Sequence, residues 1–390
     1  MMRLFRFIIF LYLPFSICAH AVEIDINARE YILVDFLTEH VLAAKNENQR
    51  MPPSSMSKLM TTYMVFDALK SGRLSLDDEL EVSVNAWRRG GAASGGSTMF
   101  LEPGSSVKVE DLLRGVIIQS GNDACIVFAE GLSGTEGSFA EAMNAKSKMI
   151  GLTNSNFTNS TGLPDPQHYM TAHDLAILSK RLILDFPEFY ELYSETSFTY
   201  NGITQGNRNP LLYRVGSGAD GLKTGYTSNA GYGLTATSIR NGRRLIMVAN
   251  GMDNIRVRDQ DSIKILDWGF RESLNKTLFN AGDIVTNIEM WLGESTTVPV
   301  AVQEDVIITI PRSLVQNLDV KVVYDGPIPA PITKGEAIAT LEVRFGKDDL
   351  LTLPLHSTTK ADRLGFFGRL LAAATYFIFG PPLSVAEQLN

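Results

Sequence analysis

Cysteine and histidine are scarce in this chain, and their scarcity excludes several kinds of site. The 390 residues include two cysteines, Cys18 in an apolar N-terminal segment and Cys125 in an apolar helical run. With one cysteine in the body of the chain, an internal disulfide is excluded and a buried structural thiol is expected. The five histidines form no H-E-x-x-H sequence, so we expect no metal site, no cofactor and no Ser-His-Asp triad.

An excess of positive charge and long apolar runs are also absent. The formal net charge is −8, and basic residues do not interleave with aromatic residues to form a stripe. Nucleic acid is therefore not an expected partner. The uncharged run at residues 370–379 is too short to cross a bilayer as a helix.

Residues 1–21 have the organisation of a signal peptide. Arg3 and Arg6 precede an apolar run at residues 7–17, and Ala19-His20-Ala21 matches the A-x-A cleavage pattern. We expect cleavage after Ala21 and export of the remaining chain. An uncleaved N-terminal anchor is the alternative, for which the apolar run is short.

Residues 22–274 have the pattern of one α+β domain, an antiparallel sheet with helices. The expected elements are strands 31–35 and 40–44, helices 59–69, 109–119, 123–132, 136–150 and 171–184, strands 232–237 and 245–249, and helix 258–270. An Asn241-Gly242 turn joins the last two strands. The Gly- and Ser-rich residues 82–106 predict a long loop over a surface or a cleft.

After residue 274 the pattern changes twice. Short β-type runs separated by turns fill residues 275–357 and predict a small all-β domain. In residues 358–390, apolar side chains recur at helical spacing close to three cations. The apolar positions are Phe366, Phe367, Leu370, Leu371, Ala374, Phe377 and Ile378, and the cations are Lys360, Arg363 and Arg369. This tail predicts an amphipathic helix lying in a membrane surface; a core helix packed on the β-domain is the alternative.

The sequence Ser55-Met56-Ser57-Lys58 stands between two prolines and a helix-forming run. We expect a helix to begin here, with Ser54 or Ser55 as the N-cap. Residues three apart share a helix face, so the Ser55 hydroxyl and the Lys58 amine can meet. A lysine whose pKa is lowered by burial or by another cation can act as the base for a serine nucleophile. The pattern alone is common by chance.

Two further motifs strengthen this interpretation. Ser120-Gly121-Asn122 follows an apolar helical run; its serine can shuttle a proton, and Asn122 can hold the lysine and donate to a substrate carbonyl. Lys223-Thr224-Gly225 opens a β-like segment, where Lys223 and Thr224 can bind a carboxylate and Gly225 leaves room for a substrate along the strand. Each motif alone is as well explained by an ordinary turn or strand.

In this order, S-x-x-K, S-x-N and K-T-G form the motif set of penicillin-binding proteins and serine β-lactamases. The chain resembles the low-molecular-mass penicillin-binding proteins, the serine-type D-alanyl-D-alanine carboxypeptidases of bacterial cell-wall metabolism. The resemblance covers nearly the whole chain. It includes Met51-Pro52-Pro53-Ser54, Gln119-Ser120-Gly121-Asn122-Asp123-Ala124, Phe157-Thr158-Asn159-Ser160-Thr161-Gly162-Leu163, Gly221-Leu222-Lys223-Thr224-Gly225 and Trp268-Gly269-Phe270.

The resemblance implies a set of catalytic roles. Ser55 would attack the carbonyl between the two terminal D-alanines of the peptidoglycan stem peptide, with Lys58, kept neutral by nearby cationic charge, as base. Ser120 would relay a proton to the leaving D-alanine, and water would hydrolyse the acyl-enzyme. The backbone amides of Ser55 and Tyr226 would hold the oxyanion. Tyr226 stands where some members have histidine, which leaves its side-chain effect on deacylation open.

The resemblance also implies a binding site for the substrate carboxylate at Thr224, Lys223 and an arginine. The family places that arginine just before the last helix of the domain, which favours Arg258 over its neighbour Arg256. Arg208 matches another arginine found near the family's site.

The resemblance further implies an exported, periplasmic enzyme held by its tail at the outer face of the cytoplasmic membrane. Its partners would be the peptidoglycan stem peptide and β-lactam antibiotics, which would acylate and inhibit it. A D,D-endopeptidase that cleaves cross-links would use the same residues and stays an alternative. A β-lactamase is disfavoured because residues 161–168 contain no glutamate to activate a deacylating water. A non-catalytic wall-binding protein is disfavoured by the complete motif set.

Overall fold

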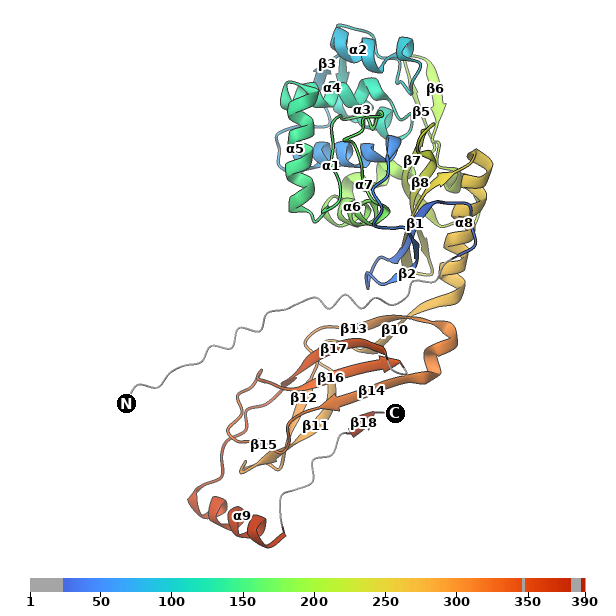
Figure 1. The fold of residues 1–390 in the computed structure, drawn as a ribbon. Helices are drawn as coiled ribbons and strands as arrows, with labels where there is room; N and C mark the ends of the chain where they lie inside the picture. Colours follow the sequence, from blue (N-terminus) through green and yellow to red (C-terminus); the bar gives the residue numbers. More distant parts are fainter. Residues whose placement is uncertain (1–23, 346–347, 380–386, 390) are drawn as a thin grey trace. The chain divides into compact units, whose positions relative to one another are not determined.

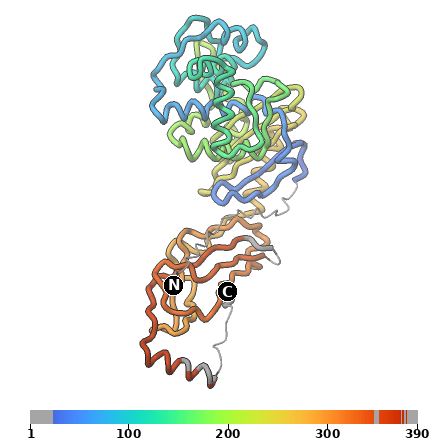
Figure 2. Tube along the Cα trace, turned by 60° about the vertical axis from the view of Figure 1, so that its left-hand side comes forward, coloured from blue at the N-terminus to red at the C-terminus, as the bar shows by residue number. Residues whose placement is uncertain are grey.

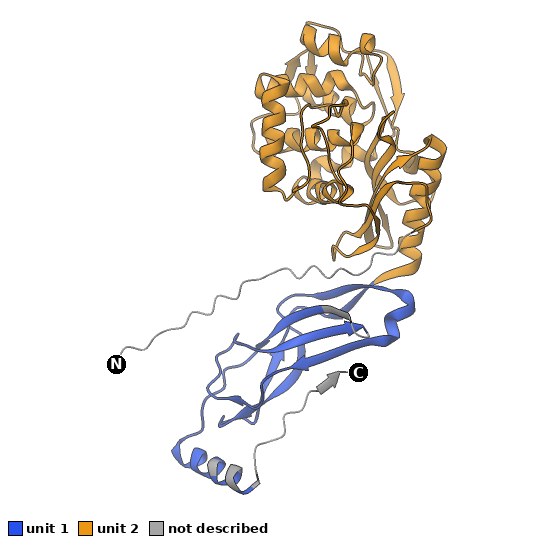
Figure 3. Cartoon of the chain, in the orientation of Figure 1, with its two compact units in different colours: residues 1–20, 275–390 blue, residues 21–274 orange. Residues whose placement is uncertain are grey.

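A computed structural model describes residues 24–345, 348–379 and 387–389 (Figure 1). The chain divides after Leu274 into two compact units, coloured orange and blue in Figure 3. This division lies at the boundary that the change in sequence pattern predicts. The predicted signal peptide lies outside the described residues.

The N-terminal unit is built on a five-stranded antiparallel sheet in the order β2-β1-β9-β8-β7. The strands are β1 (Glu30–Asp35), β2 (Val41–Lys45), β7 (Ala219–Thr227), β8 (Gly231–Arg240) and β9 (Arg243–Met252). Asn241 and Gly242 form the predicted turn between β8 and β9, and both have positive φ. Figure 2 shows the blue N-terminal strands beside the yellow part of the chain that contains β9, with which β1 pairs.

Side chains alternate between the two faces of this sheet, so the sheet separates two cores. Ile32 of β1 packs with the helices on one face, while Tyr31 and Leu33 pack on the other face with residues of α8 (Ile255–Glu272). The helical face carries α1 (Lys58–Lys70), α3 (Val109–Ile117), α4 (Asn122–Ser133), α5 (Glu136–Met149) and α6 (Ala172–Asp185) (Figure 1). Most residues of α1 are buried, which places its N-terminus deep inside the unit.

The stretch predicted as a long loop at residues 82–106 contains two short helices, α2 (Val84–Gly90) and η2 (Ala92–Ser94). The hydroxyl of Ser83 accepts a hydrogen bond from Ala86 N and caps α2. The many glycines in this stretch favoured the prediction of a loop, so the helix capped by Ser83 was not predicted from the sequence. The other short elements are β3 (Glu79–Glu81), β4 (Ser106–Lys108), α7 (Pro187–Tyr190), η3 (Glu191–Ser194), β5 (Ser197–Tyr200), β6 (Ile203–Gly206) and η4 (Pro210–Tyr213).

The C-terminal unit is a small all-β domain, as predicted. A seven-stranded sheet has the order β15-β11-β12-β17-β16-β14-β18, and β10 pairs with β13. The elements are β10 (Ser273–Phe279), β11 (Ile284–Trp291), β12 (Thr297–Ala301), β13 (Val306–Pro311), η5 (Arg312–Asn317), β14 (Leu318–Val323), β15 (Ile328–Pro329), β16 (Ala337–Phe345), β17 (Asp348–Ser357) and β18 (Glu387–Leu389). Strand β17 contains Pro354, and proline is rare inside sheets. Pro354 lies where β17 pairs with β16, away from its short contact with β12.

The tail begins later than the predicted boundary between residues 357 and 358. Ala361 forms a β-bridge with Ile332, and Leu364 N donates to the Leu292 carbonyl. Backbone pairing therefore extends the β-domain to about Leu364. Helix α9 (Phe366–Phe379) follows. Of the three cations predicted near the apolar helix face, Arg369 lies on α9, while Lys360 and Arg363 precede it. Within the described residues, no helix has the length and apolar character needed to cross a bilayer.

Candidate functional site

Ser55 lies in a single 3-10 turn, η1 (Ser54–Ser57), which leads directly into α1. A helix therefore begins where the sequence predicts, but the predicted N-cap is wrong. Neither Ser54 nor Ser55 caps a helix, because their hydroxyls bond to Thr227 Oγ1 and to the Lys58 amine. Ser54 has a φ of 50°, a left-handed conformation that is costly for a residue with a side chain.

The amine of Lys58 is the best-buried charged group of the site, since the residue is 1% exposed. Lys58 Nζ lies 2.8 Å from Ser55 Oγ and donates to the Thr161 carbonyl at 2.6 Å. Burial lowers the pKa of Lys58 to about 8, and the positive charge of Arg208 contributes in the same direction. The sequence predicts burial or another cation as the cause of a lowered lysine pKa, and burial is the larger of the two here.

The second motif lies beside this pair. Ser120 has a φ of 61°, and its buried hydroxyl has no hydrogen-bond partner. An unpaired buried hydroxyl is costly, and such groups often mark a place where a substrate binds. Asn122 is the first residue of α4. The expected bond from Asn122 to Lys58 is not formed, because the Thr161 carbonyl takes the position of acceptor for the amine.

The third motif lies on β7, the edge strand of the sheet next to η1. Lys223 and Thr224 are buried, and burial lowers the pKa of Lys223, helped by the positive charge of Lys58. A side chain at Gly225 would place its Cβ 2.9 Å from the Pro53 carbonyl oxygen and 3.1 Å from the Cβ of Ser54. Pro53 and the turn η1 therefore lie where a side chain at Gly225 would point.

Both predicted arginines border the site. Arg258 is 7% exposed, its Nη2 donates to the Arg208 carbonyl at 3.2 Å, and its buried Nε has no partner. Arg208 Nη1 donates to Ser97 Oγ at 2.5 Å. Arg256, the competing residue, is exposed to solvent and does not line the site.

Two pockets meet at Ser55. We call the first, of about 430 Å³, the cationic pocket because Arg208 and Arg258 line it. We call the second, of about 420 Å³, the Leu163 pocket because Leu163 lines it. The cationic pocket is lined by Ser55, Ser97, Ser120, Arg208, Thr224, Gly225, Tyr226, Tyr232, Ile255 and Arg258. The Leu163 pocket is lined by Ser55, Gly95, Gly96, Ser97, Asn122, Thr161, Gly162, Leu163, Arg208, Tyr226 and Thr227. All predicted site residues line these pockets except the lysines Lys58 and Lys223, which are buried.

The sequence assigned no role to the loop at residues 158–163, which positions Lys58. Asn159 Oδ1 accepts hydrogen bonds from the backbone amides of Thr161 and Gly162 and so fixes the loop. A Cβ at Gly162 would lie 1.9 Å from the Ser54 carbonyl oxygen, and its φ is 77°. Only glycine fits there. The cluster of Asn, Ser, Thr and Gly was a signal for a turn, but not for a turn that contacts the lysine.

The sequence also assigned no role to His168. Its ring is 3% exposed, Nδ1 accepts from Thr158 N at 3.2 Å, and Nε2 lies 2.8 Å from Ser57 Oγ. Because Nδ1 is an acceptor, Nε2 carries the proton and donates to Ser57. Burial lowers the pKa of His168 to about 4, so the ring is neutral at neutral pH. His168 thus ties the 158–168 segment to the turn that carries Ser55.

In the described part of the chain, no group of three or more His, Cys, Asp or Glu residues is arranged to hold a metal ion. The chemistry that the site supports by itself is nucleophilic attack by a serine activated by a lysine.

The low pKa of His168 predicts a pH dependence of folding. Between its folded value of about 4 and its ordinary value of 6.5, the unfolded chain binds more protons, so stability falls as pH falls through this window. This one group contributes up to about 3 kcal/mol at neutral pH. Urea unfolding at pH values between about 4 and 7 should therefore show a shallower pH dependence for His168→Gln than for the wild type.

The matched control is His173→Gln, which changes a half-buried histidine whose side chain is 45% exposed. It should keep the wild-type pH dependence. An unchanged slope in His168→Gln would show that the ring is not held neutral by burial.

Comparison with known proteins places these residues in a family. A family model described as D-alanyl-D-alanine carboxypeptidase matches residues 17–254, and one described as penicillin-binding protein 5, C-terminal domain, matches residues 275–363. The D-alanyl-D-alanine carboxypeptidase DacC of Escherichia coli (strain K12) is 39% identical over 366 residues, which cover 93% of this chain and 92% of that protein.

A second relative and a solved structure agree. The D-alanyl-D-alanine carboxypeptidase DacA of Haemophilus influenzae is 38% identical over 350 residues, 89% of this chain and 88% of that protein. The crystal structure of penicillin-binding protein 5 from Haemophilus influenzae matches with a TM-score of 0.78 at 36% identity and covers 88% of this chain and 99% of that chain. The chain therefore belongs to the D-alanyl-D-alanine carboxypeptidase family of low-molecular-mass penicillin-binding proteins.

Proposed function

We propose that this carboxypeptidase removes the terminal D-alanine of peptidoglycan stem pentapeptides through an acyl-enzyme on Ser55. The observation that carries the proposal is the contact of 2.8 Å between Lys58 Nζ and Ser55 Oγ at the meeting point of two open pockets. A serine beside a partly neutral lysine is an activated nucleophile. The two pockets provide room for the substrate on both sides of the bond to be cleaved.

In the acylation step, the Ser55 hydroxyl gives its proton to the neutral Lys58 amine and its oxygen bonds to the substrate carbonyl carbon. The Thr161 carbonyl holds one N–H of the amine and so directs the nitrogen lone pair toward Ser55. The oxyanion that forms is held by the backbone amides of Ser55 and Tyr226, donors that are oriented before the reaction begins.

Collapse of the tetrahedral intermediate breaks the C–N bond to the terminal D-alanine. Ser120 passes a proton from Lys58 to the leaving amine, a role that its unpaired buried hydroxyl supports. Asn122, in the Leu163 pocket, donates to the carbonyl of the substrate on the acyl side. Water then hydrolyses the acyl-enzyme by the reverse sequence of proton transfers.

The terminal carboxylate of the substrate occupies the cationic pocket. Thr224 and Arg258 line this pocket, and the orphaned Nε of Arg258 is a donor without a partner. Arg208 lines both pockets, and Lys223 lies buried beside Thr224. This concentration of positive charge favours a free carboxylate at the leaving residue, which is the feature that distinguishes a carboxypeptidase substrate.

The same chemistry makes β-lactams acylating inhibitors. Among the described residues that line the two Ser55 pockets, none is an aspartate or a glutamate. Asp174 accepts hydrogen bonds from Asn154 N and Ser155 Oγ, and Asp165 accepts from Gln167 N. Neither carboxylate is placed to activate a water for rapid deacylation, which supports slow release of bound penicillin rather than β-lactamase activity.

The central test compares wild type with Ser55→Ala. Wild type should release D-alanine from a stem pentapeptide and bind labelled penicillin covalently, while Ser55→Ala should lose D-alanine release by roughly a thousandfold or more. Product analysis on a cross-linked dimer in the same assay measures endopeptidase activity. Undiminished D-alanine release by Ser55→Ala would refute the assignment of the nucleophile.

The pKa of Lys58 sets the pH dependence of acylation. Because the neutral amine is the base, the second-order rate of penicillin acylation should rise with pH, about tenfold per unit, and level off above the pKa of Lys58, which is about 8. Removal of the Arg208 charge removes one cause that lowers this pKa. Arg208→Gln should therefore move the midpoint of the profile upward.

Arg256→Gln removes an exposed positive charge outside the pockets and is the matched control. Its midpoint should equal that of the wild type. A profile that is flat across the range from about pH 6 to 9 would argue against Lys58 as the base.

The amphipathic helix α9 supports peripheral attachment of the exported enzyme to the outer face of the cytoplasmic membrane. Phe366, Phe367, Leu370, Leu371 and Ile378 are each between 63% and 83% exposed. Exposed aromatic and aliphatic side chains on one short helix fit a membrane interface.

Truncation after Leu364 removes α9 and the edge strand β18 but retains the β-bridges of residues 361–363. The truncated protein should leave the membrane fraction and keep wild-type D-alanine release, measured by cell fractionation and by the pentapeptide assay. Replacement of Phe367 and Leu371 by serine should weaken membrane binding without truncation. Full membrane association of the truncated protein would exclude the helix as the anchor.

A further inference from the structure

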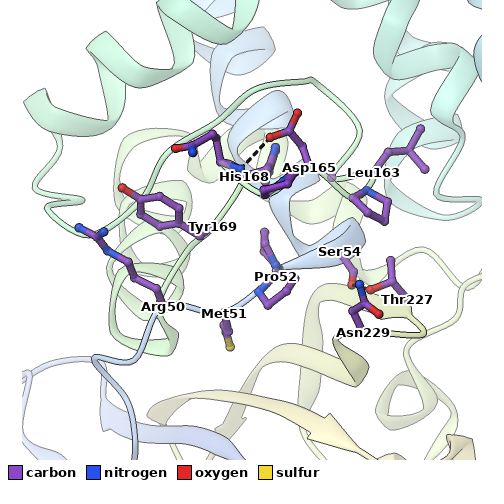
Figure 4. Close-up of a pocket in the computed structure, with 15 residues that line it drawn as sticks. Arg50, Met51, Pro52, Ser54, Leu163, Asp165, His168, Tyr169, Thr227 and Asn229 are labelled. Atoms are coloured by element: carbon purple, nitrogen blue, oxygen red, sulfur yellow. Dashed lines mark hydrogen bonds between the residues drawn. The ribbon is translucent and has the colours of Figure 1, made fainter.

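A third pocket, of about 650 Å³, adjoins the Leu163 pocket (Figure 4). Gly162, Leu163 and Thr227 line both. The proposed mechanism uses none of the remaining lining residues. We call this third pocket the Arg50 pocket because Arg50 lines it.

The direction in which a substrate lies leads to this pocket. If the terminal carboxylate occupies the cationic pocket, the acyl part of the peptide leaves Ser55 on the other side. That side is the Leu163 pocket, which continues past Leu163 and Thr227 into the Arg50 pocket. An acyl group longer than one residue therefore enters the Arg50 pocket.

The walls of the Arg50 pocket are rigid. Pro52, Pro53, Pro164 and Pro166 contribute to its lining, and proline fixes the backbone φ. His168 contributes a buried ring that is hydrogen-bonded at both nitrogens. A pocket with pre-formed walls loses little conformational entropy when it binds a peptide.

Arg50 gives the pocket a chemical preference. Its guanidinium lies over the Tyr169 ring, 4.4 Å from the ring centroid, and in Figure 4 both residues lie on the side away from Leu163 and Thr227. No ion pair of Arg50 is formed within the described residues. The pocket's carboxylate, Asp165, accepts from Gln167 N within its own loop. Arg50 is therefore held in place with its N–H donors available to an anion.

We infer that the Arg50 pocket binds the part of the donor peptide that precedes the acylated residue, and that Arg50 pairs with a carboxylate on that part. The inference rests on the proposed carboxypeptidase function and extends it to substrate selection. The anionic groups of a peptide substrate are carboxylates, and a planar guanidinium binds them through two parallel hydrogen bonds.

The test uses two stem pentapeptides that differ in one carboxylate upstream of the acylated D-alanine, free in one and amidated in the other. Wild type should prefer the free carboxylate. Arg50→Gln should lower kcat/KM for that peptide by roughly fivefold, the size expected of an exposed charge pair, and leave kcat/KM for the amidated peptide unchanged. Tyr169→Leu, which removes the platform of the guanidinium, should act in the same direction.

Two controls separate the possible failures. Arg256→Gln should leave both peptides unaffected, and penicillin acylation of Arg50→Gln should equal that of wild type, since penicillin lacks the upstream peptide. Equal losses on both peptides, or no loss on either, would overturn the Arg50 pairing while D-alanine release by wild type upheld the carboxypeptidase. Absence of D-alanine release by wild type from both peptides would overturn both proposals.

Discussion

The site depends on keeping a lysine amine away from water while it touches a serine hydroxyl. Water stabilises the charged form of an amine, so burial of Lys58 favours the neutral form that can accept a proton. The Thr161 carbonyl satisfies one donor of the amine, which lowers the cost of burying it. The reactivity that we propose for Ser55 therefore depends on the burial of Lys58 at the start of the central helix α1.

That depth requires unusually close packing around η1. Gly225 on β7 lets the edge strand approach the turn from one side, and Gly162 lets the 158–163 loop approach the Ser54 carbonyl from the other. A side chain at either glycine would separate the turn from its neighbours. His168 adds a hydrogen bond from the same segment to Ser57. Two segments that lie far from it in the chain thus hold one four-residue turn, and the left-handed conformation of Ser54 persists because this packing supports it.

The pockets on either side of Ser55 differ in chemistry. The cationic pocket combines Arg258 and Arg208 with Thr224. The Leu163 pocket shares Arg208, and with its continuation it also contains prolines, Leu163 and the stacked cation Arg50. In the proposed function, this difference orients a peptide with a free terminal carboxylate before the reaction. Orientation of the scissile carbonyl against Ser55 lowers the entropic part of the barrier. The same asymmetry supports the proposed release of a single residue with a carboxylate rather than cleavage within a longer chain.

The sequence by itself determined the two-part fold and the residues of the three motifs, because periodicity, turns and motif order are local properties. It predicted the helices around α1 and the hairpin of β8 and β9 closely. Only the tertiary structure decided the parts that depend on contacts between distant segments. The hydroxyls of Ser54 and Ser57 cap no helix because Thr227 and His168 reach them from elsewhere. Gly225 accommodates η1, and Thr161 rather than Asn122 holds Lys58. Hydrogen-bond partners more than a hundred residues apart leave no spacing pattern in the sequence, so the geometry of the site emerges from the packing of the folded chain.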